Sequence, residues 1–267
     1  MFASKFATVT KLDLEMINLR TSRELVEFIS SFHSLSYLTL SAMRCKKLRP
    51  NPARRVTQPL SRIEIIGTTG HCIANLLIFF HGANSHSGLI ELDISPSESS
   101  VLDVSMDFIH GSVSLRHLTF SLCNLPESNS ETGSLNLNSA MELRTLIFKA
   151  KYPVSHIAFL IRTLSTVRRS KLKEVVVHVN FGPELQDLDE EMLKNVDWDA
   201  LDTILTTTHI PMLESVIICI MLGSQSNIGL DFFERRLPLL HGRGILTVAL
   251  PKDDDGFSDD DLQGLDE

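Results

Sequence analysis

Residues 115–123 read LRHLTFSLC, and this stretch decides the fold. Leu115, Leu118 and Phe120 follow the spacing apolar-x-x-apolar-x-apolar, and Cys123 comes three positions after Phe120. Apolar residues that alternate over such a short run predict a β-strand with one buried face. The residues between them, such as Thr119, are polar, so the other face of this strand is expected to meet solvent.

The same spacing recurs along the chain, which gives nine copies in all. Successive copies start 26, 25, 29, 26, 28, 29, 41 and 32 residues apart. Most of these intervals fall in the window of about 20–29 residues that is typical of leucine-rich repeats. Stacked repeats of this kind predict one parallel sheet of about nine strands. The other eight copies begin at Val9, Leu35, Leu60, Leu89, Leu143, Leu172, Leu213 and Ile245.

Helical periodicity fills most of the stretches between these strands. Thr21 and Glu24 have the spacing of a capping box ahead of an apolar helical face. Ser155, and either Asp197 or Asp199, are further candidates for helix N-caps. Strands that alternate with helices pair in parallel. We therefore predict an α/β leucine-rich-repeat solenoid, or horseshoe, with the sheet on the concave face and the helices on the convex face.

A closed (β/α)8 barrel is the alternative architecture, and it would make an enzyme with an undetected active site the expected function. Both faces of a barrel strand are buried and should be apolar. Here the residues between the repeat leucines are often charged, as at Lys11, Arg62 and Glu64. Burying so many charges in a dry core would cost a large desolvation free energy, which favours the open horseshoe.

Charge is concentrated at one end of the chain. The formal net charge of the 267 residues is −8, and residues 252–267 carry eight acidic residues and one lysine, so the remainder sums to −8 − (−7) = −1. A near-neutral body does not favour a nucleic-acid partner. Hydrophobic residues form 43% of the chain, enough to bury a core. We predict a solenoid domain over residues 1–251 and a disordered acidic tail over residues 252–267.

Three internal segments interrupt the repeat. Residues 44–59 hold six basic residues and no acidic one, which we interpret as a solvated loop rather than a nuclear-import or nucleic-acid patch. Residues 124–141 are rich in Ser, Asn and Glu and are predicted to be mobile. Residues 181–196 are acidic and account for the 41-residue interval.

The sequence carries no signal for membrane attachment or secretion. The N-terminus lacks the apolar region of a signal peptide, and the longest apolar run, residues 73–80, is too short to span a bilayer. The four cysteines are too far apart for a zinc or redox motif. Three of them lie among apolar neighbours and are expected to be reduced. We therefore expect a cytoplasmic or nuclear protein.

The candidate site is formed by the strand residues that alternate with the repeat leucines. No motif for catalysis, cofactor binding or metal binding is found, and stacked carboxylates such as Glu64 and Asp93 are interpreted as an acidic docking surface. The C-terminal half of this face is apolar, which is unusual unless a partner or the chain itself covers it, and both explanations stay open. The partner is expected to be a protein, bound by Asp13, Glu15, Tyr37, Glu64, Glu91, Asp93, His117, Ile147, Val176 and Ile217.

Both ends of the repeat region resemble a known family. Residues 197–218, DWDALDTILTTTHIPMLESVII, and residues 232–250, FFERRLPLLHGRGILTVAL, resemble the closing segments of fungal F-box-like leucine-rich-repeat proteins. Residues 9–40 resemble the first two repeats of that group. The resemblance implies the substrate-recognition module of a cullin-type ubiquitin ligase. The F-box-like segment that grips the ligase adaptor precedes the repeats in this family, whereas the first repeat here begins at Val9, so we expect no adaptor binding by this chain.

Overall fold

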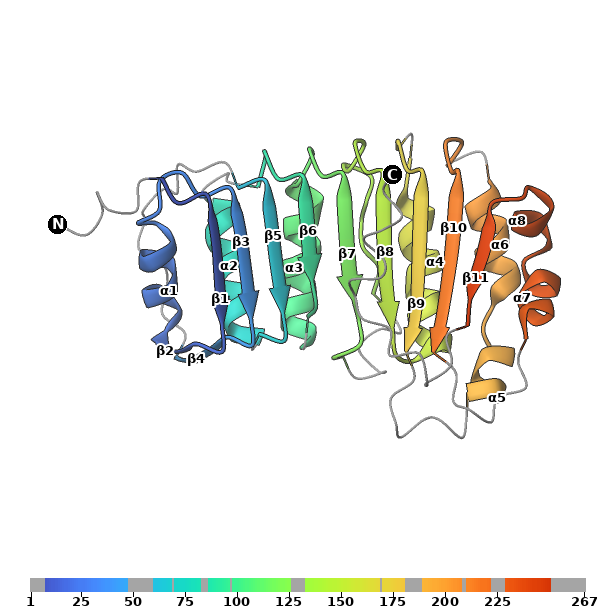
Figure 1. Ribbon diagram of the computed structural model, residues 1–267, viewed down its shortest axis with the longest axis horizontal. Helices are drawn as coiled ribbons and strands as arrows, with labels where there is room; N and C mark the ends of the chain where they lie inside the picture. The colour runs from blue at the N-terminus through green and yellow to red at the C-terminus, as the bar shows by residue number, and fades with distance from the viewer. Residues whose placement is uncertain are drawn as a thin grey trace.

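The computed structural model describes residues 8–47, 60–68, 70–82, 86–96, 98–125, 133–168, 170–180, 189–207, 210–221 and 229–250. Strands and helices follow one another along these residues and form an α/β fold (Figure 1). The strands are β1 (Lys11–Glu15), β2 (Asn18–Thr21), β3 (Tyr37–Ser41), β4 (Arg44–Lys47), β5 (Arg62–Ile66), β6 (Glu91–Ile94), β7 (His117–Ser121), β8 (Thr145–Ala150), β9 (Glu174–Asn180), β10 (Ser215–Met221) and β11 (Leu246–Ala249). The helices are α1 (Ser22–Ile29), α2 (Gly70–Gly82), α3 (Ser99–Gly111), α4 (Pro153–Thr166), α5 (Asp189–Lys194), α6 (Trp198–Thr206), α7 (Leu230–Arg236) and α8 (Pro238–Gly242).

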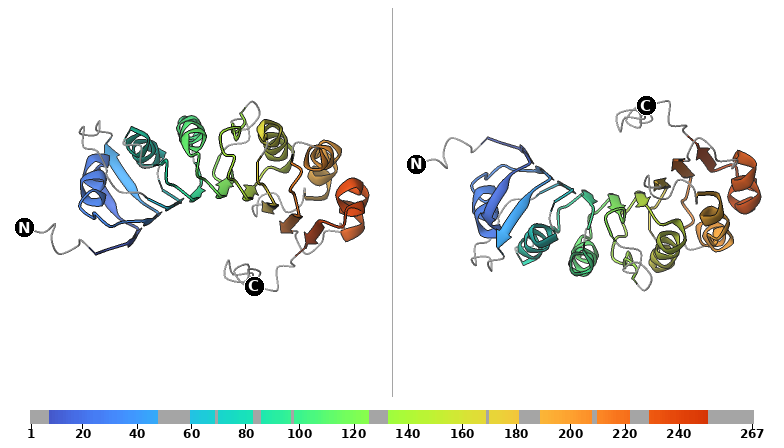
Figure 2. Two further views of the ribbon diagram at one scale, coloured as in Figure 1. Left: turned by 90° about the horizontal axis from the view of Figure 1, so that it is seen from above. Right: turned by 90° about the horizontal axis from the view of Figure 1, so that it is seen from below.

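One parallel sheet of nine strands organises the molecule. Its order is β1-β3-β5-β6-β7-β8-β9-β10-β11, and β2 and β4 form a separate two-stranded parallel sheet. Among the described residues β1 and β11 are the two edges and do not pair, so the sheet is open and the closed-barrel alternative is wrong. Viewed from above, the sheet follows an arc and the helices lie along its outer side (Figure 2).

The register of the sheet stacks the repeat positions of one copy on those of the next. Leu118, for example, pairs with Leu92 on one side and with Leu146 on the other. The prediction that Leu118 and Leu146 are buried is confirmed, since their side chains are 1% and 0% exposed. The whole ladder consists of Leu12, Leu38, Ile63, Leu92, Leu118, Leu146, Val175 and Val216, and it continues to Leu246.

The last copy is shifted from its predicted register. The sequence spacing aligns Val248 with Val216, but in the sheet Val216 pairs with Leu246, two residues earlier. The strand begins directly after a turn at Gly244, which has φ 69°. A shift of two residues leaves every side chain on the same face, so the apolar alternation alone cannot detect it.

A repeated backbone contact joins neighbouring strands of the sheet from β1 to β10. The carbonyl oxygen of Arg116 accepts hydrogen bonds from the N–H groups of both Arg144 (2.8 Å) and Thr145 (3.1 Å). Because main-chain groups make this contact, it recurs whatever side chain stands at the position. The carbonyl oxygens that accept two N–H groups in this way are those of Thr10, Ser36, Ser61, Ile90, Arg116, Arg144 and Lys173.

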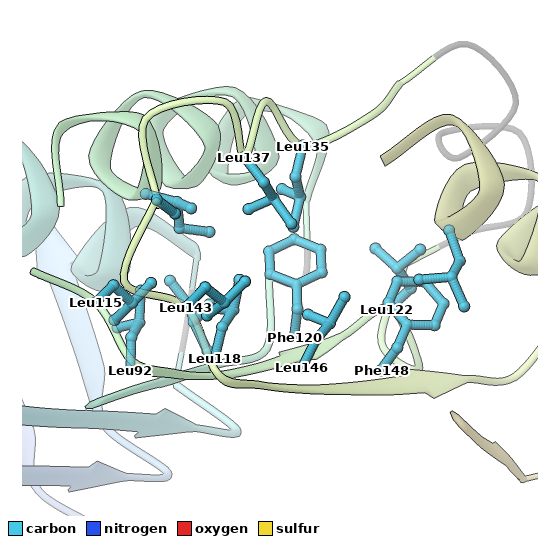
Figure 3. Packing of buried hydrophobic residues seen from close by; sticks show 14 of the residues in the cluster. Leu92, Leu115, Leu118, Phe120, Leu122, Leu135, Leu137, Leu143, Leu146 and Phe148 are labelled. Carbon is cyan, nitrogen blue, oxygen red and sulfur yellow. The ribbon is translucent and has the colours of Figure 1, made fainter. Parts of the chain in front are cut away.

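The core lies between the sheet and the outer layer. Phe159 of α4 stacks between Phe120 and Phe148, with ring centroids 6.1 Å from each. All three rings are buried, and repeat leucines of neighbouring strands surround the two strand phenylalanines (Figure 3). The apolar side of the strands is therefore covered by the outer layer, and the opposite side of the sheet faces away from it.

Between β7 and β8, the described residues 133–141 pack against the core without forming a helix. Leu135 and Leu137 are buried in the core (Figure 3). Their N–H groups donate to the hydroxyl oxygens of Thr163 (3.0 Å) and Thr166 (2.9 Å) in α4. The prediction that residues 124–141 are mobile is therefore wrong for residues 133–141, because α4 supplies the backbone partners that an extended chain lacks. Residues 126–132 lie outside the described residues, as do residues 181–188 and the predicted tail, 252–267. Residues 48–59 of the predicted basic loop also lie outside them, and residues 44–47 form β4, so the prediction of a loop is wrong for these four residues.

Helix caps agree with the sequence at two of three predicted positions. The hydroxyl oxygen of Thr21 accepts a hydrogen bond from the N–H of Glu24 (3.4 Å), and the N-cap of α6 is Asp197 rather than Asp199. Ser155 is not a cap, because Pro153 starts α4 two residues earlier. Proline suits this first helical position, since its φ is already fixed near the helical value.

Cysteine chemistry differs from the expectation of reduced thiols. Cys72 in α2 is fully buried and disulfide-bonded, so the expectation is wrong for this residue. Spacing in the sequence reveals local cysteine motifs, but it does not reveal which cysteines the fold brings together. Cys123 and Cys219 are free, and burial raises the pKa of both thiols.

Candidate partner-binding face

The side of the sheet that faces away from the helices is called the concave face here. Alternation along the strands places two long rows of side chains on it. The first row is Lys11, Tyr37, Arg62, Glu91, His117, Thr145, Glu174 and Ser215. The second row is Asp13, Thr39, Glu64, Asp93, Thr119, Ile147, Val176, Ile217 and Thr247. Nine of the ten predicted partner-binding residues lie in these two rows, and Glu15 lies two positions beyond Asp13.

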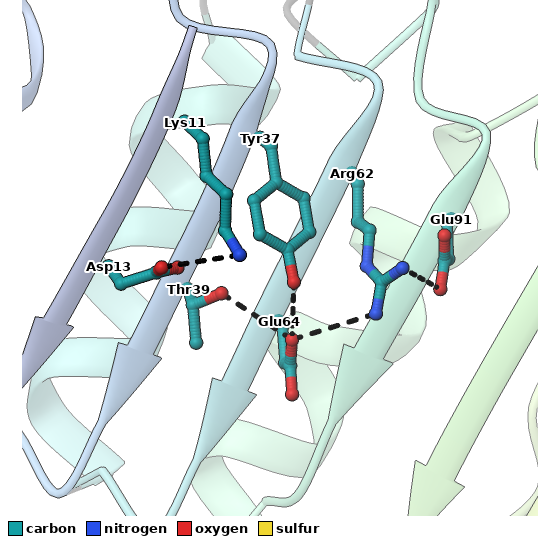
Figure 4. Close-up of polar contacts among 7 residues, drawn as sticks. All are labelled: Lys11, Asp13, Tyr37, Thr39, Arg62, Glu64 and Glu91. Atoms are coloured by element: carbon teal, nitrogen blue, oxygen red, sulfur yellow. Dashed lines mark hydrogen bonds and ion pairs between the residues drawn. The ribbon is translucent and has the colours of Figure 1, made fainter. Parts of the chain in front are cut away.

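Tyr37 is the centre of a polar network on the N-terminal half of this face (Figure 4). Its hydroxyl donates a hydrogen bond to Oε2 of Glu64 (3.0 Å), which also accepts one from Thr39 (3.4 Å). Its ring lies between two cations, with Nζ of Lys11 4.7 Å and Cζ of Arg62 4.8 Å from the ring centroid. These contacts fix the tyrosine ring and present a preformed polar surface.

Arg62 joins two carboxylates of neighbouring strands. Its Nη1 lies 3.0 Å from Oε1 of Glu91, and its Nη2 lies 3.8 Å from Oε2 of Glu64. Nζ of Lys11 lies 3.3 Å from Oδ2 of Asp13. The acidic docking surface expected from the sequence is thus partly neutralised within the face. These ion pairs are part-exposed, so each contributes little to stability.

Asp93 is the exception among these carboxylates. Burial raises its pKa to about 6, the nearby charge of Lys149 opposes this rise, and that of Glu64 adds to it. Within the described residues, no hydrogen bond or close ion pair reaches the carboxylate of Asp93. A partly buried carboxylate without a direct partner is a place where a cationic group from another molecule would be stabilised.

An apolar row crosses the C-terminal half of the face. Ile147 of β8 pairs with Val176 of β9, which pairs with Ile217 of β10. Val176 is 7% exposed, and the two isoleucines are partly exposed. Since Val176 is buried and the two isoleucines are only partly exposed, the row is a shallow apolar strip rather than a fully exposed one.

Polar residues that the sequence projection missed border this apolar strip. Glu174 precedes Val176 by two residues on β9, and Lys149 follows Ile147 by two residues on β8. Within the described residues, Glu174 has no ion pair. Its position is equivalent to that of Glu91, so a full projection of the repeat onto the face would have found it. The strip therefore has an acidic border on one side and a basic border on the other.

Other kinds of site are not formed by the part of the chain described. Over these residues, no group of three or more His, Cys, Asp or Glu side chains is placed to hold a metal ion. No helix among them combines the length and apolar character needed to cross a membrane. In comparisons with known proteins, no protein-family model matches the chain, and no curated protein matches it. The geometry of the concave face is thus the basis for inferring a function.

Proposed function

We propose that this chain is a leucine-rich-repeat solenoid that binds another protein on its concave face and carries out no chemistry itself. The observation that carries the proposal is a nine-stranded parallel sheet whose helices, in the described part of the chain, lie along one side only (Figure 2). Parallel sheets are normally covered on both faces, so a face that no described helix covers, with an apolar strip on it, favours a partner. A protein surface offers the mixture of apolar and charged groups that fits it.

The regularity of the structure supports the repeat assignment. Each of the nine copies supplies one strand of the sheet, and each strand pairs only with the strands of the copies next to it. The doubly accepting carbonyl oxygens recur at equivalent positions from Thr10 to Lys173. Contacts limited to neighbouring units are the defining property of solenoid proteins, whose concave surfaces bind partners.

The family resemblance supports a more specific role for the binding face. In F-box-like proteins, the repeats select the protein that the ligase modifies, and the concave face proposed here would select its partner in the same way. The N-terminal half of the face is consistent with a protein partner rather than a nucleic acid. Both cations in its first row, Lys11 and Arg62, already contact carboxylates, so they form no free basic stripe for phosphates.

Affinity capture with matched variants tests this proposal. The immobilised full chain, its Ile217→Asp variant and its Ile78→Asp variant are each incubated with a lysate of the native source, and bound proteins are quantified by mass spectrometry. Ile217 lies in the apolar strip, whereas Ile78 is 55% exposed on α2. We expect proteins that bind the wild type and the Ile78→Asp variant but are lost from Ile217→Asp. Equal capture by the wild type and both folded variants would show that the concave face is not the binding site.

A further inference from the structure

The apolar strip and Asp93 lie in one line across the sheet. Asp93, Thr119, Ile147, Val176 and Ile217 occupy equivalent positions on five neighbouring strands, β6 to β10. Neighbouring strands are about 4.8 Å apart, so Asp93 lies about 10 Å from Ile147 and about 19 Å from Ile217. A partner that uses the whole line must therefore run across the strands, with its apolar groups at one end and a polar group at the other.

Charge determines which polar group the partner brings. Asp93 stands at the end of the line with no direct ion pair among the described residues, and Glu174 borders the strip without one. A molecule that covers this region removes water from both carboxylates, which costs free energy unless a cation replaces the water. The complementary group at the Asp93 end is therefore a lysine or arginine side chain.

Spacing determines the conformation of the partner. The three apolar side chains of the strip, Ile147, Val176 and Ile217, span two strand intervals, or about 9.6 Å. Two turns of an α-helix advance about 10.8 Å and differ from this span by about 1.2 Å. An extended chain presents side chains on one face about every 6.8 Å. Two such steps cover about 13.6 Å, which exceeds the span of the strip by about 4 Å. A helix therefore places one apolar side chain against each member of the strip, and an extended peptide does not.

We propose that the occupant of the concave face is an amphipathic α-helix lying across β6 to β10, with a lysine or arginine against Asp93. Its apolar residues at positions i, i+4 and i+7 contact Ile147, Val176 and Ile217. One end of this triplet contacts Ile147. The cationic residue lies seven residues, or about two helical turns, beyond that end and contacts Asp93. The proposal rests on the function proposed above, because it names the chemistry of the partner that this face binds.

A displayed peptide library tests the proposal directly, because selection reveals which sequences the face binds. Random peptides of about 20 residues, long enough to cover the line as a helix, are selected for binding to the immobilised full chain. Clones that also bind the Ile217→Asp variant are removed. If that variant fails to fold by circular dichroism, Thr119→Lys serves instead, because it places a cation in the line between Asp93 and Ile147. The dissociation constants of the selected peptides are then measured on the wild type, on Asp93→Asn and on Asp103→Asn, a matched change at an exposed position of α3.

The expected peptides carry a basic residue seven positions from an i, i+4, i+7 apolar triplet and gain helical circular dichroism on binding. Their affinity falls about tenfold on Asp93→Asn and is unchanged on Asp103→Asn. Apolar residues that alternate in steps of two, or equal affinity for wild type and Asp93→Asn, would overturn the helical partner and leave the binding face in place. A selection that yields no clone dependent on the concave-face variants would overturn both proposals.

Discussion

The buried carboxylate of Asp202 in α6 accepts a hydrogen bond from the backbone N–H of Leu240, 2.9 Å away and 38 residues later in the chain. Its second oxygen accepts the N–H of Leu239 at 2.8 Å. One side chain thereby caps the start of α8 with a negative charge, which both satisfies the free N–H groups and complements the helix dipole. This contact ties the last helix to the rest of the outer layer.

Removal of this cap should destabilise the C-terminal end of the molecule. Asp202→Ala leaves two N–H groups without their acceptor, and we expect a loss of about 2–4 kcal/mol in the free energy of unfolding. Urea denaturation followed by circular dichroism measures the change. The control is Asp199→Ala, which removes a carboxylate from the exposed first turn of the same helix and should cost less than about 1 kcal/mol. Similar losses for the two variants would contradict the capping role.

The orientation of the strand side chains can be tested at two adjacent residues of β7. Leu118 is 1% exposed between the sheet and the outer layer, so Leu118→Ala should cost about 2–5 kcal/mol through lost burial and a residual cavity. Thr119 lies on the concave face and is part-exposed, so Thr119→Ala should cost less than about 1 kcal/mol. Thermal melts of the two purified variants measure both losses, and equal shifts would contradict this assignment of the two faces.

Gly111 is required by the packing of His86. A Cβ atom at Gly111 would lie 2.7 Å from Nε2 of His86, whose ring is buried and stacks on His81 with centroids 4.7 Å apart. We therefore expect Gly111→Ala to lower the free energy of unfolding by about 1–3 kcal/mol because of this clash. A double-mutant cycle with His86→Ala should recover most of that loss. Additive effects of the two substitutions would show that the clash is relieved in another way.

His156 should make stability depend on pH. The side chain is fully buried, and Nδ1 accepts a hydrogen bond from the N–H of Lys151 (3.1 Å). Burial lowers its pKa from 6.5 to about 4, so the folded protein holds the neutral ring while the unfolded chain takes up a proton near pH 6.5. The stability that this pKa difference contributes is complete above pH 6.5 and is lost as the pH falls towards 4. The loss amounts to about 3 kcal/mol.

Comparison with His156→Asn isolates this effect. Asparagine does not titrate and retains an oxygen that can accept the N–H of Lys151, so the variant should have a flatter stability profile between pH 7 and pH 4. Guanidinium denaturation at a series of pH values gives both profiles. If the wild type and the variant lost stability in parallel over this range, groups other than His156 would be responsible for the pH dependence.

The strand pattern was the most predictable part of the fold. Alternation around Leu118 identified the strand, its buried face and its concave face, because a period of two residues is a direct consequence of the pleat. The register of the last copy was not predictable, since pairing of Val216 with Leu246 or with Val248 satisfies the same alternation. Residues 133–141 are held in place by hydroxyl groups of α4, and Thr163 lies 28 residues after its partner Leu135. A local sequence pattern does not reveal contacts between residues so far apart.

The candidate site was predictable in position but not in charge. Projection of the repeat placed Glu64, Asp93 and Ile217 on one face, as found. It did not show that Arg62 pairs with both Glu64 and Glu91, because that requires the reach of a flexible side chain across strands. Glu174 stands at a repeat position, so the same spacing was sufficient to place it on this face beside the apolar strip.

The doubly accepting carbonyl oxygens give the rim of the sheet a particular freedom to evolve. The residues that make this contact include a serine, an isoleucine and two arginines, as at Ser61, Ile90, Arg116 and Arg144. The main-chain bonds need no particular side chain, although the hydroxyls of Ser36 and Ser61 each add a hydrogen bond to the same carbonyl oxygens. Whole units can also be duplicated or lost, because each new joint is made by the same atoms as the old one. Side chains at this rim can therefore vary while the main-chain scaffold beneath them stays the same.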